Sequence, residues 1–228
     1  MFFDTTYLIW VLLPSLVLSG LAQLFVRSAY SHWSNVRNAQ NLTGPQVAQA
    51  IIRTAGLDGV RLEGVPGELT DHFDPQTNVV RLSQTVATTP SVAAMAIVAH
   101  ELGHAQQYQE KSLLIGARSL LLPAVRFSPM AAYGLIMAGF LLRTTGLIQI
   151  GIIFFAVTVL FMILTLPVEI DASMRGLRLL RASGVMTTTE EIGGARQVLT
   201  AAALTYIAAA ITAVLQLLYY ISLTQRRR

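Results

Sequence analysis

The stretch Gly146–Val168 reads GLIQIGIIFFAVTVLFMILTLPV and contains no charged side chain. As an α-helix with a rise of 1.5 Å per residue, it would extend about 35 Å, which exceeds the roughly 30 Å hydrocarbon core of a bilayer. A run this long and this apolar is typical of a transmembrane helix. The stretch therefore predicts a membrane protein.

Three further apolar runs are of comparable length: Tyr7–Val26, Leu120–Leu142 and Val198–Leu223. Only 12% of the residues are charged, about half the share in soluble domains, so the composition agrees with four membrane-spanning helices. The first run has no basic residue before it and no clear cleavage site after it, which favours a retained anchor over a signal peptide. In the second run, Pro123 and Pro129 flank Arg126 and allow a broken helix there.

The composition also excludes several kinds of site. The chain has no cysteine, so any metal must be bound by His, Asp or Glu. The net charge of +4 comes from arginines beside the apolar runs and from the tail Arg226–Arg228. Such residues are topology signals or lipid headgroup contacts, and no basic cluster of the kind that binds nucleic acid is present in the sequence. We therefore expect contact with the lipid bilayer and no nucleic acid partner.

The basic residues also predict an orientation in the membrane. If all four runs cross the bilayer, 27–119 and 169–197 lie on one side, and most arginines near the runs belong to these two segments. Basic residues concentrate on the cytoplasmic side. We therefore expect both segments in the cytoplasm and both termini outside, although Arg226–Arg228 argue for the opposite orientation.

The segment 27–119 is predicted to form a small α+β domain. LTGPQVAQAIIRTAG has Thr43 as a helix N-cap and Gly56 as a stop signal. GVRLEGV and NVVRLS alternate like short strands, and DHFDPQTN between them has the composition of a turn. A second helix is expected over about 90–109, with Thr89 as its cap and Pro90 in its first turn.

This second helix carries HELGH at residues 100–104, within AHELGHAQQ. His100 and His104 are four residues apart and project from one helix face, so both imidazoles can bind one zinc ion at about 2.0–2.1 Å. Glu101 lies one step further round the helix, which suits a general base acting on water that the metal activates. The pattern is the H-E-x-x-H motif of zinc proteases. Coincidental spacing is the alternative, and the scarcity of polar residues in this chain disfavours it.

A catalytic zinc site has three protein ligands and one open position, so a third ligand is required. No histidine follows His104, which leaves a carboxylate. Glu169 comes directly after the third apolar run, and two membrane crossings return the chain to the side of His104. An acidic side chain at a membrane boundary is costly unless it has a partner or a function. Glu169 is therefore the leading candidate, and a structural ion pair with Arg175 or Arg178 is the alternative.

Several residues are secondary candidates. Asp171 is predicted to orient a ligand histidine through its second ring nitrogen, or else to be solvated. Three side chains are possible donors to a reaction oxyanion, namely His72, Arg196 and Tyr206. For His72, in the DHFDP turn, ordinary turn chemistry is the favoured explanation, and Tyr206 could pack at a helix interface.

The segment NVVRLS has two interpretations. It could be an edge strand that pairs with an extended peptide substrate, or it could be an ordinary core strand. The residues concerned are Asn78, Val79, Val80, Arg81 and Leu82.

Taken in order, LTDHFDP, NVVRLS, VAHELGHAQQ, LPVEIDAS and VLTAAALTY resemble the bacterial YugP-like neutral zinc metallopeptidases over nearly the whole chain. The resemblance implies a gluzincin-type peptidase of the bacterial inner membrane. It also implies one Zn²⁺ ion held by His100, His104 and Glu169, with Glu101 as the base. A looser similarity to HtpX and the CAAX-prenyl endopeptidases fails after Glu169, because those families have Asp four residues later and this chain has Ser173.

We therefore expect a mainly α-helical protein with four transmembrane helices and a small α+β zincin-like domain at the membrane surface. The expected segments are 1–26 (first helix), 27–119 (zincin-like domain), 120–168 (second and third helices), 169–197 (third ligand) and 198–228 (fourth helix and basic tail). The expected activity is hydrolysis of peptide bonds in membrane or membrane-proximal proteins. The alternative is a non-catalytic membrane scaffold or a zinc-binding or transport protein, which would have no need for Glu101 between the histidines.

Overall fold

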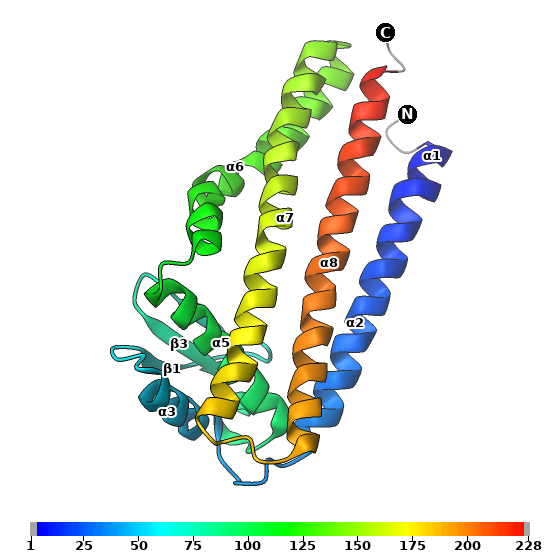
Figure 1. Ribbon diagram of the computed structural model, residues 1–228. Helices are drawn as coiled ribbons and strands as arrows, with labels where there is room; N and C mark the ends of the chain where they lie inside the picture. Colours follow the sequence, from blue (N-terminus) through cyan, green and yellow to red (C-terminus); the bar gives the residue numbers. More distant parts are fainter. Residues whose placement is uncertain (1–3, 226–228) are drawn as a thin grey trace. The chain divides into compact units, whose positions relative to one another are not determined.

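The computed structural model describes residues 4–225 (Figure 1), so the predicted role of Arg226–Arg228 in orientation falls outside the described residues. The chain is mainly helical with one small sheet. Its internal contacts divide it into two compact units. Among the described residues, the first unit consists of 4–23, Gly116–Pro167 and 204–225, and the second of Leu24–Ile115 and Val168–Ala203.

Four long helices are apolar enough, by length and composition, to cross a membrane, as the sequence predicts. The first comprises α1 (Thr5–Tyr7), the π-helical turn η1 (Leu8–Leu12) and α2 (Leu13–Ser34). The others are α6 (Leu113–Leu141), α7 (Thr145–Ala182) and α8 (Thr189–Gln225), and Figure 1 shows each as one long coil. Because α7 continues well past Val168, Glu169 lies inside a helix that also contains the apolar run.

The first unit contains most of α6, which is helical through both Pro123 and Pro129. The helix is therefore not broken here, although the two prolines would allow a break. Each proline removes one backbone hydrogen bond, and the remaining turns hold the helix together while its axis bends. Figure 1 shows α6 changing direction part-way along its length. In the same unit, Gly151 of α7 lies against Ile136 of α6 and allows close packing of these two helices.

The second unit contains a three-stranded sheet in the order β1-β3-β2. β1 (Arg61–Val65) is parallel to β3 (Val79–Ser83), and β2 (His72–Asp74) is antiparallel to β3. The two predicted strands are present as β1 and β3. The prediction that all of DHFDPQTN is a turn is wrong, because its second to fourth residues form β2.

The edge-strand interpretation of NVVRLS is also wrong. β3 is the central strand, and both of its sides are already paired with neighbouring strands. Four of its five residues are buried, as expected for a core strand. Of the predicted set, Asn78 precedes the strand with a positive φ of 54°, and the others (Val79, Val80, Arg81 and Leu82) belong to β3.

Three shorter helices complete the second unit: α3 (Gly44–Ala55), α4 (Gln84–Thr88) and α5 (Val92–Gln109). α3 has the predicted ends, with a capping box at Thr43 and a left-handed Gly56 after its last turn. The N-cap of α5 is Ser91, whose side chain accepts a hydrogen bond from the backbone N–H of Ala94. The predicted cap, Thr89, instead ends α4, a short helix that the sequence reading did not anticipate.

The start of α8 is fixed by a buried carboxylate. Glu191 accepts hydrogen bonds from the backbone N–H groups of Ala39, Thr187 and Thr188, at 2.8–2.9 Å. The Thr188 hydroxyl accepts in turn from the Glu191 N–H at 3.1 Å, which completes a capping box. Glu191 therefore both caps α8 and ties it to the loop before α3.

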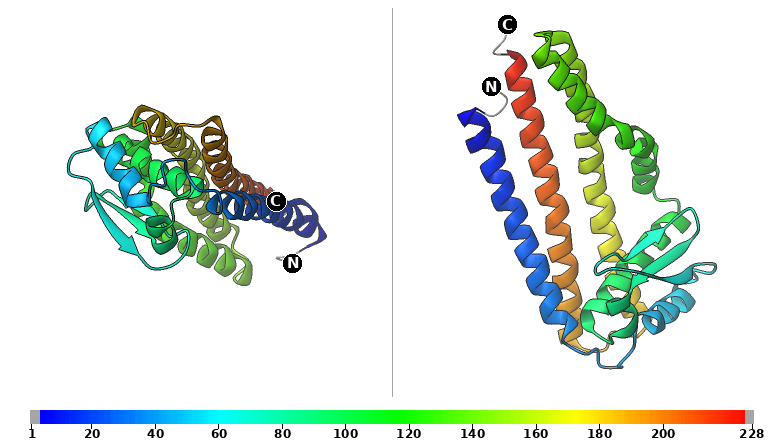
Figure 2. Two further views of the ribbon diagram at one scale, coloured as in Figure 1. Left: turned by 90° about the horizontal axis from the view of Figure 1, so that it is seen from below. Right: turned by 180° about the vertical axis from the view of Figure 1, so that it is seen from behind.

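α5 is the central element of the second unit. Its neighbours include α3, α4, β2 and β3, and Figure 2 shows the sheet and α3 beside it. Most of its residues are buried, including Met95 and Leu102. A helix enclosed on several sides in this way holds the side chains it carries in fixed positions.

Two glycines allow α5 to approach α7 closely. A Cβ atom on Gly103 of α5 would lie 2.3 Å from the carbonyl oxygen of Ala172, and one on Gly176 of α7 would lie 2.8 Å from the backbone of Ala99. Neither distance is compatible with a side chain. The two backbones are therefore in contact, which brings Glu169 of α7 to the face of α5 that carries the histidines.

Candidate metal centre

Three side chains from two helices converge in the second unit. His100 and His104 are one turn apart on α5, and their Nε2 atoms lie 3.3 Å and 3.4 Å from Oε2 of Glu169 on α7. The potential ligand atoms of all three lie within 4.8 Å of one another. The side chain of Glu169 is only 5% exposed, and the histidines are 15% and 11% exposed.

This geometry fits a tetrahedral metal ion. Zinc–ligand bonds of about 2.0–2.1 Å at tetrahedral angles separate neighbouring ligand atoms by about 3.3–3.4 Å. The two Nε2–Oε2 distances agree with that separation. Two imidazoles and one carboxylate also form a ligand set that zinc uses in hydrolytic sites with a fourth position for substrate or water. His100, His104 and Glu169 can therefore hold a zinc ion.

The second ring nitrogen of His104 is bonded within the protein. Its Nδ1 lies 3.0 Å from Oε1 of Gln107, a fully buried residue. The amide nitrogen of Gln107 donates to the carbonyl of Val168 at 2.9 Å and to Asp171 at 2.7 Å. Because both partners are acceptors, the amide orientation is fixed and Oε1 must accept from His104 Nδ1–H. In neutral His104 this leaves the lone pair on Nε2, on the side of Glu169.

Asp171 therefore acts differently from the predicted direct contact with a ligand histidine. Its carboxylate reaches His104 only through Gln107. Asp171 also accepts a hydrogen bond from Arg175 at 2.7 Å, and Arg175 donates at 2.6 Å to Glu110 just beyond the end of α5. Arg175, one of the two alternative partners predicted for Glu169, is thus paired with Asp171 and Glu110 instead.

His100 is held by a hydroxyl group. Its Nδ1 lies 3.1 Å from Oγ of Ser173, which is one turn after Glu169 on α7. One face of α7 thus contacts both nitrogens of His100, Nε2 through Glu169 and Nδ1 through Ser173. Ser173 occupies the position at which the looser resemblance expects an acid, and a hydroxyl makes the contact there.

Glu101 is buried beside the two histidines and is 8% exposed. Its Oε2 accepts a hydrogen bond of 2.9 Å from the backbone N–H of Phe73 in β2. This bond fixes the direction of the carboxylate and ties it to an edge strand of the sheet.

The charges in the centre favour a cation. Burial alone would lower the pKa of His104, but hydrogen bonding to Glu169 and the charges of Glu169 and Glu101 outweigh it, so the pKa is raised. The field that favours a proton on His104 also favours a metal cation.

Comparison with known proteins agrees with this geometry. The sequence profile of the family described as "Putative neutral zinc metallopeptidase" matches residues 8–225. The chain belongs to this family. The curated protein named "Putative membrane protease YugP" from Bacillus subtilis (strain 168) is 39% identical over 213 residues, which cover 93% of this chain and 94% of that protein. The family resemblance seen in the sequence is confirmed. No solved structure matches the chain.

Other predicted site residues of this family member lie elsewhere. His72 is exposed on β2, and its Nδ1 lies 2.8 Å from the carbonyl of Thr70. Arg196 is exposed on α8 and lines a separate pocket that also includes Ser173. Tyr206 is 37% exposed on α8 and belongs to the first unit. A role for these three in stabilising an oxyanion stays a prediction.

Gln107 and Phe73 were missed by sequence reasoning. Gln107 is three residues after His104 and therefore on the same helix face, a signal that could have identified it as a partner of that histidine. Phe73 contributes only its backbone N–H, and no side-chain pattern encodes such a contact.

Proposed function

We propose that the chain is a membrane-bound zinc endopeptidase. The observation that supports this most strongly is the convergence of His100, His104 and Glu169, with two Nε2–Oε2 distances that match a tetrahedral zinc site and all three ligand atoms within 4.8 Å of one another. The family description and the name of the relative agree with it. Zinc, when bound, would supply a Lewis acid that polarises a peptide carbonyl and lowers the pKa of water.

In this proposal, Glu101 moves the proton. It is adjacent to the ligands, and the N–H of Phe73 holds one of its oxygens. Its carboxylate takes a proton from the attacking water and delivers it to the nitrogen of the leaving amine. His100, His104 and Glu169 position the metal, while Gln107 and Ser173 hold the two imidazoles by their outer nitrogens.

The substrate side is proposed to be β2 and not β3. β2 is an edge strand, and its Phe73 N–H points to Glu101. An extended peptide lying along this edge would bring a carbonyl near both the metal and the base, because strand addition aligns backbones at fixed spacing. Phe73 also stacks edge-on with Tyr108 of α5, with 5.5 Å between ring centroids.

One feature of the fold supports a proposal for the location of the substrates. Glu169 lies on a helix that is apolar and long enough to span a membrane, which supports a site near a membrane surface. We propose that membrane or membrane-proximal proteins are cleaved, at the cytoplasmic face of the bacterial inner membrane. Cysteine substitution at exposed Arg53 of α3, followed by labelling of intact cells with an impermeant reagent, tests the orientation. No labelling is expected.

The decisive variant is Glu101→Gln, which keeps the size of the side chain and removes its basicity. We expect the zinc content to equal that of the wild type and the cleavage of membrane proteins to fall to background. Membrane proteins that accumulate in cells carrying this variant are candidate substrates. The matched control is Glu68→Gln. Glu68 is exposed in the loop after β1, so this variant should cleave substrates at the wild-type rate. If Glu101→Gln changed nothing while zinc was fully bound, the chain would be a non-catalytic zinc-binding scaffold.

A further inference from the structure

A pocket lies beside Ser173, the residue that contacts Nδ1 of His100. It has a volume of about 410 Å³ and is lined only by residues of α7 and α8. Ser173 is one of them, and its hydroxyl contacts Nδ1 of His100, while Nε2 faces Glu169. The pocket is therefore distinct from the corner where a peptide carbonyl would bind.

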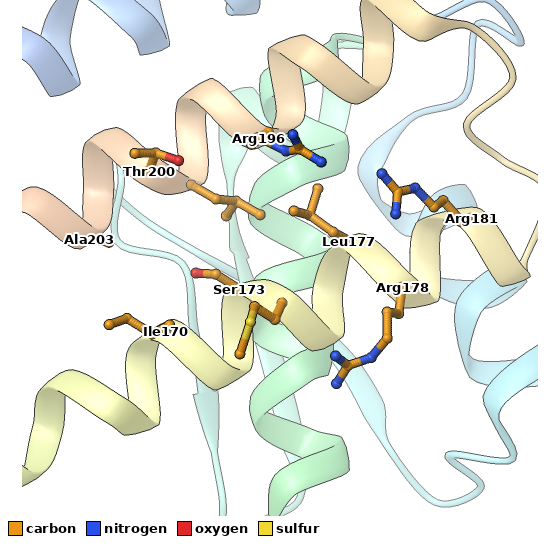
Figure 3. A pocket seen from close by; sticks show the side chains of 10 residues that line it. Ile170, Ser173, Leu177, Arg178, Arg181, Arg196, Thr200 and Ala203 are labelled. Carbon is orange, nitrogen blue, oxygen red and sulfur yellow. The ribbon is translucent and has the colours of Figure 1, made fainter.

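The pocket is cationic at one end. Figure 3 shows Arg181 and Arg196 directed toward one another there, while the side chain of Arg178 points away from both. Within residues 4–225, none of the three forms an ion pair with an acid at 4.0 Å or less, whereas nearby Arg175 is paired with both Asp171 and Glu110. Arg181 and Arg196, two facing guanidinium groups without a carboxylate partner in the described part of the chain, form a site for an anion, and the fork geometry of arginine suits phosphate.

The opposite end of the pocket is apolar. Ile170 and Ala203 lie at that end in Figure 3, and Leu177 lies between it and the arginines. This is the end nearer, along both helices, to the apolar runs of α7 and α8. The polarity thus changes from cationic to apolar in the direction of the bilayer, as it does along a phospholipid from headgroup to acyl chain.

We propose that this pocket binds one anionic phospholipid of the surrounding bilayer. The phosphate contacts the arginines, and the first part of an acyl chain lies on Leu177, Ile170 and Ala203. A free phosphate ion would contact only the cationic end of the pocket. An acidic peptide has no long hydrocarbon chain to fill the apolar end. The gradient of polarity therefore favours the lipid over both.

The test uses the full chain in nanodiscs of phosphatidylcholine with a minor share of phosphatidylglycerol, followed by native mass spectrometry of the lipid that stays bound. The wild type should retain phosphatidylglycerol above its share in the bilayer. Arg181→Gln/Arg196→Gln should lower that enrichment by about fivefold for each arginine removed. The control is the double variant Arg27→Gln/Arg53→Gln, which changes two exposed arginines outside the pocket. This control should retain the wild-type enrichment of phosphatidylglycerol. An equal loss in the control would overturn the proposal, because it would reflect surface charge alone.

A second variant addresses the apolar end. Ala203→Phe should fill the space for the acyl chain and reduce retention of long-chain phosphatidylglycerol while the arginines remain. Unchanged retention in this variant would overturn the lipid assignment. So would displacement of the bound lipid by millimolar inorganic phosphate or by a poly-glutamate peptide. If the larger side chain disturbs the fold, the arginine pair still decides the outcome.

Discussion

The contact between Gly103 and Ala172 predicts that one methyl group at position 103 will open the metal centre. Gly103 lies on α5 between the two histidines, and its Cα rests against the backbone of α7. In a helix that faced solvent, Gly→Ala would stabilise the protein by about 1 kcal/mol through helix propensity. Here the methyl group has no space, so the sign should be reversed.

The size of the effect follows from the distances. The new Cβ would lie 2.3 Å from the Ala172 oxygen, and ordinary contact begins at 3.4 Å, so α5 and α7 must separate by about 1 Å. Metal–ligand distances in functional sites vary by only about 0.2 Å. Overpacking of this kind costs about 1–3 kcal/mol. We expect zinc affinity to fall by at least the 10–100-fold that displaced ligand partners cause.

The assay is a competition titration of zinc against a chelator, together with thermal unfolding of the purified protein. The matched control is Gly193→Ala on α8, in the same unit, where an added Cβ meets nothing within 4 Å. The control should bind zinc normally and unfold at the same or a higher temperature. Normal zinc affinity in Gly103→Ala would refute the view that this backbone contact sets the distance between Glu169 and the histidines.

Four further predictions concern single side chains. Gln107→Leu removes the acceptor for His104 Nδ1–H and should lower zinc affinity by about 10–100-fold in the same titration. Glu169→Gln removes the third ligand, so the purified protein should contain little zinc; full occupancy would contradict the assignment. Glu191→Gln weakens the cap of α8 and should lower the free energy of unfolding by about 1–2 kcal/mol without affecting zinc content. Hydrogen bonds from Thr77 and Arg81 lower the pKa of Asp74 from 3.8 to about 2. The stabilisation that the ionised carboxylate gives to the fold is therefore present above pH 3.8 and is lost as the pH falls towards 2. Over that pH range, Asp74→Asn should lose less thermal stability than the wild type.

Periodicity and short motifs were sufficient for the parts of the molecule that depend on local sequence. The apolar runs predicted four long helices, and α3 begins and ends where Thr43 and Gly56 indicate. The spacing of His100 and His104 placed both on one helix face, and the need for a third ligand pointed to Glu169, whose carboxylate does lie beside both rings.

Tertiary contacts were beyond the same reasoning. β2 has only three residues and exists because it pairs with β3, so its sequence looks like a turn. By propensity alone Gly103 only weakens a helix, whereas in the fold it is required for the approach of α7. Asp171 was predicted to contact a ligand histidine directly, because nothing in the sequence indicates that Gln107 lies between Asp171 and His104.

The continuity of α7 has a mechanical consequence. The helix is continuous from Thr145 to Ala182 and contains Pro167 two residues before Glu169, so a candidate metal ligand and the apolar run belong to one helix. We expect a change in bilayer thickness that slides this helix along its axis to move the carboxylate at position 169 as well. The thickness of the host membrane is therefore predicted to affect the metal site.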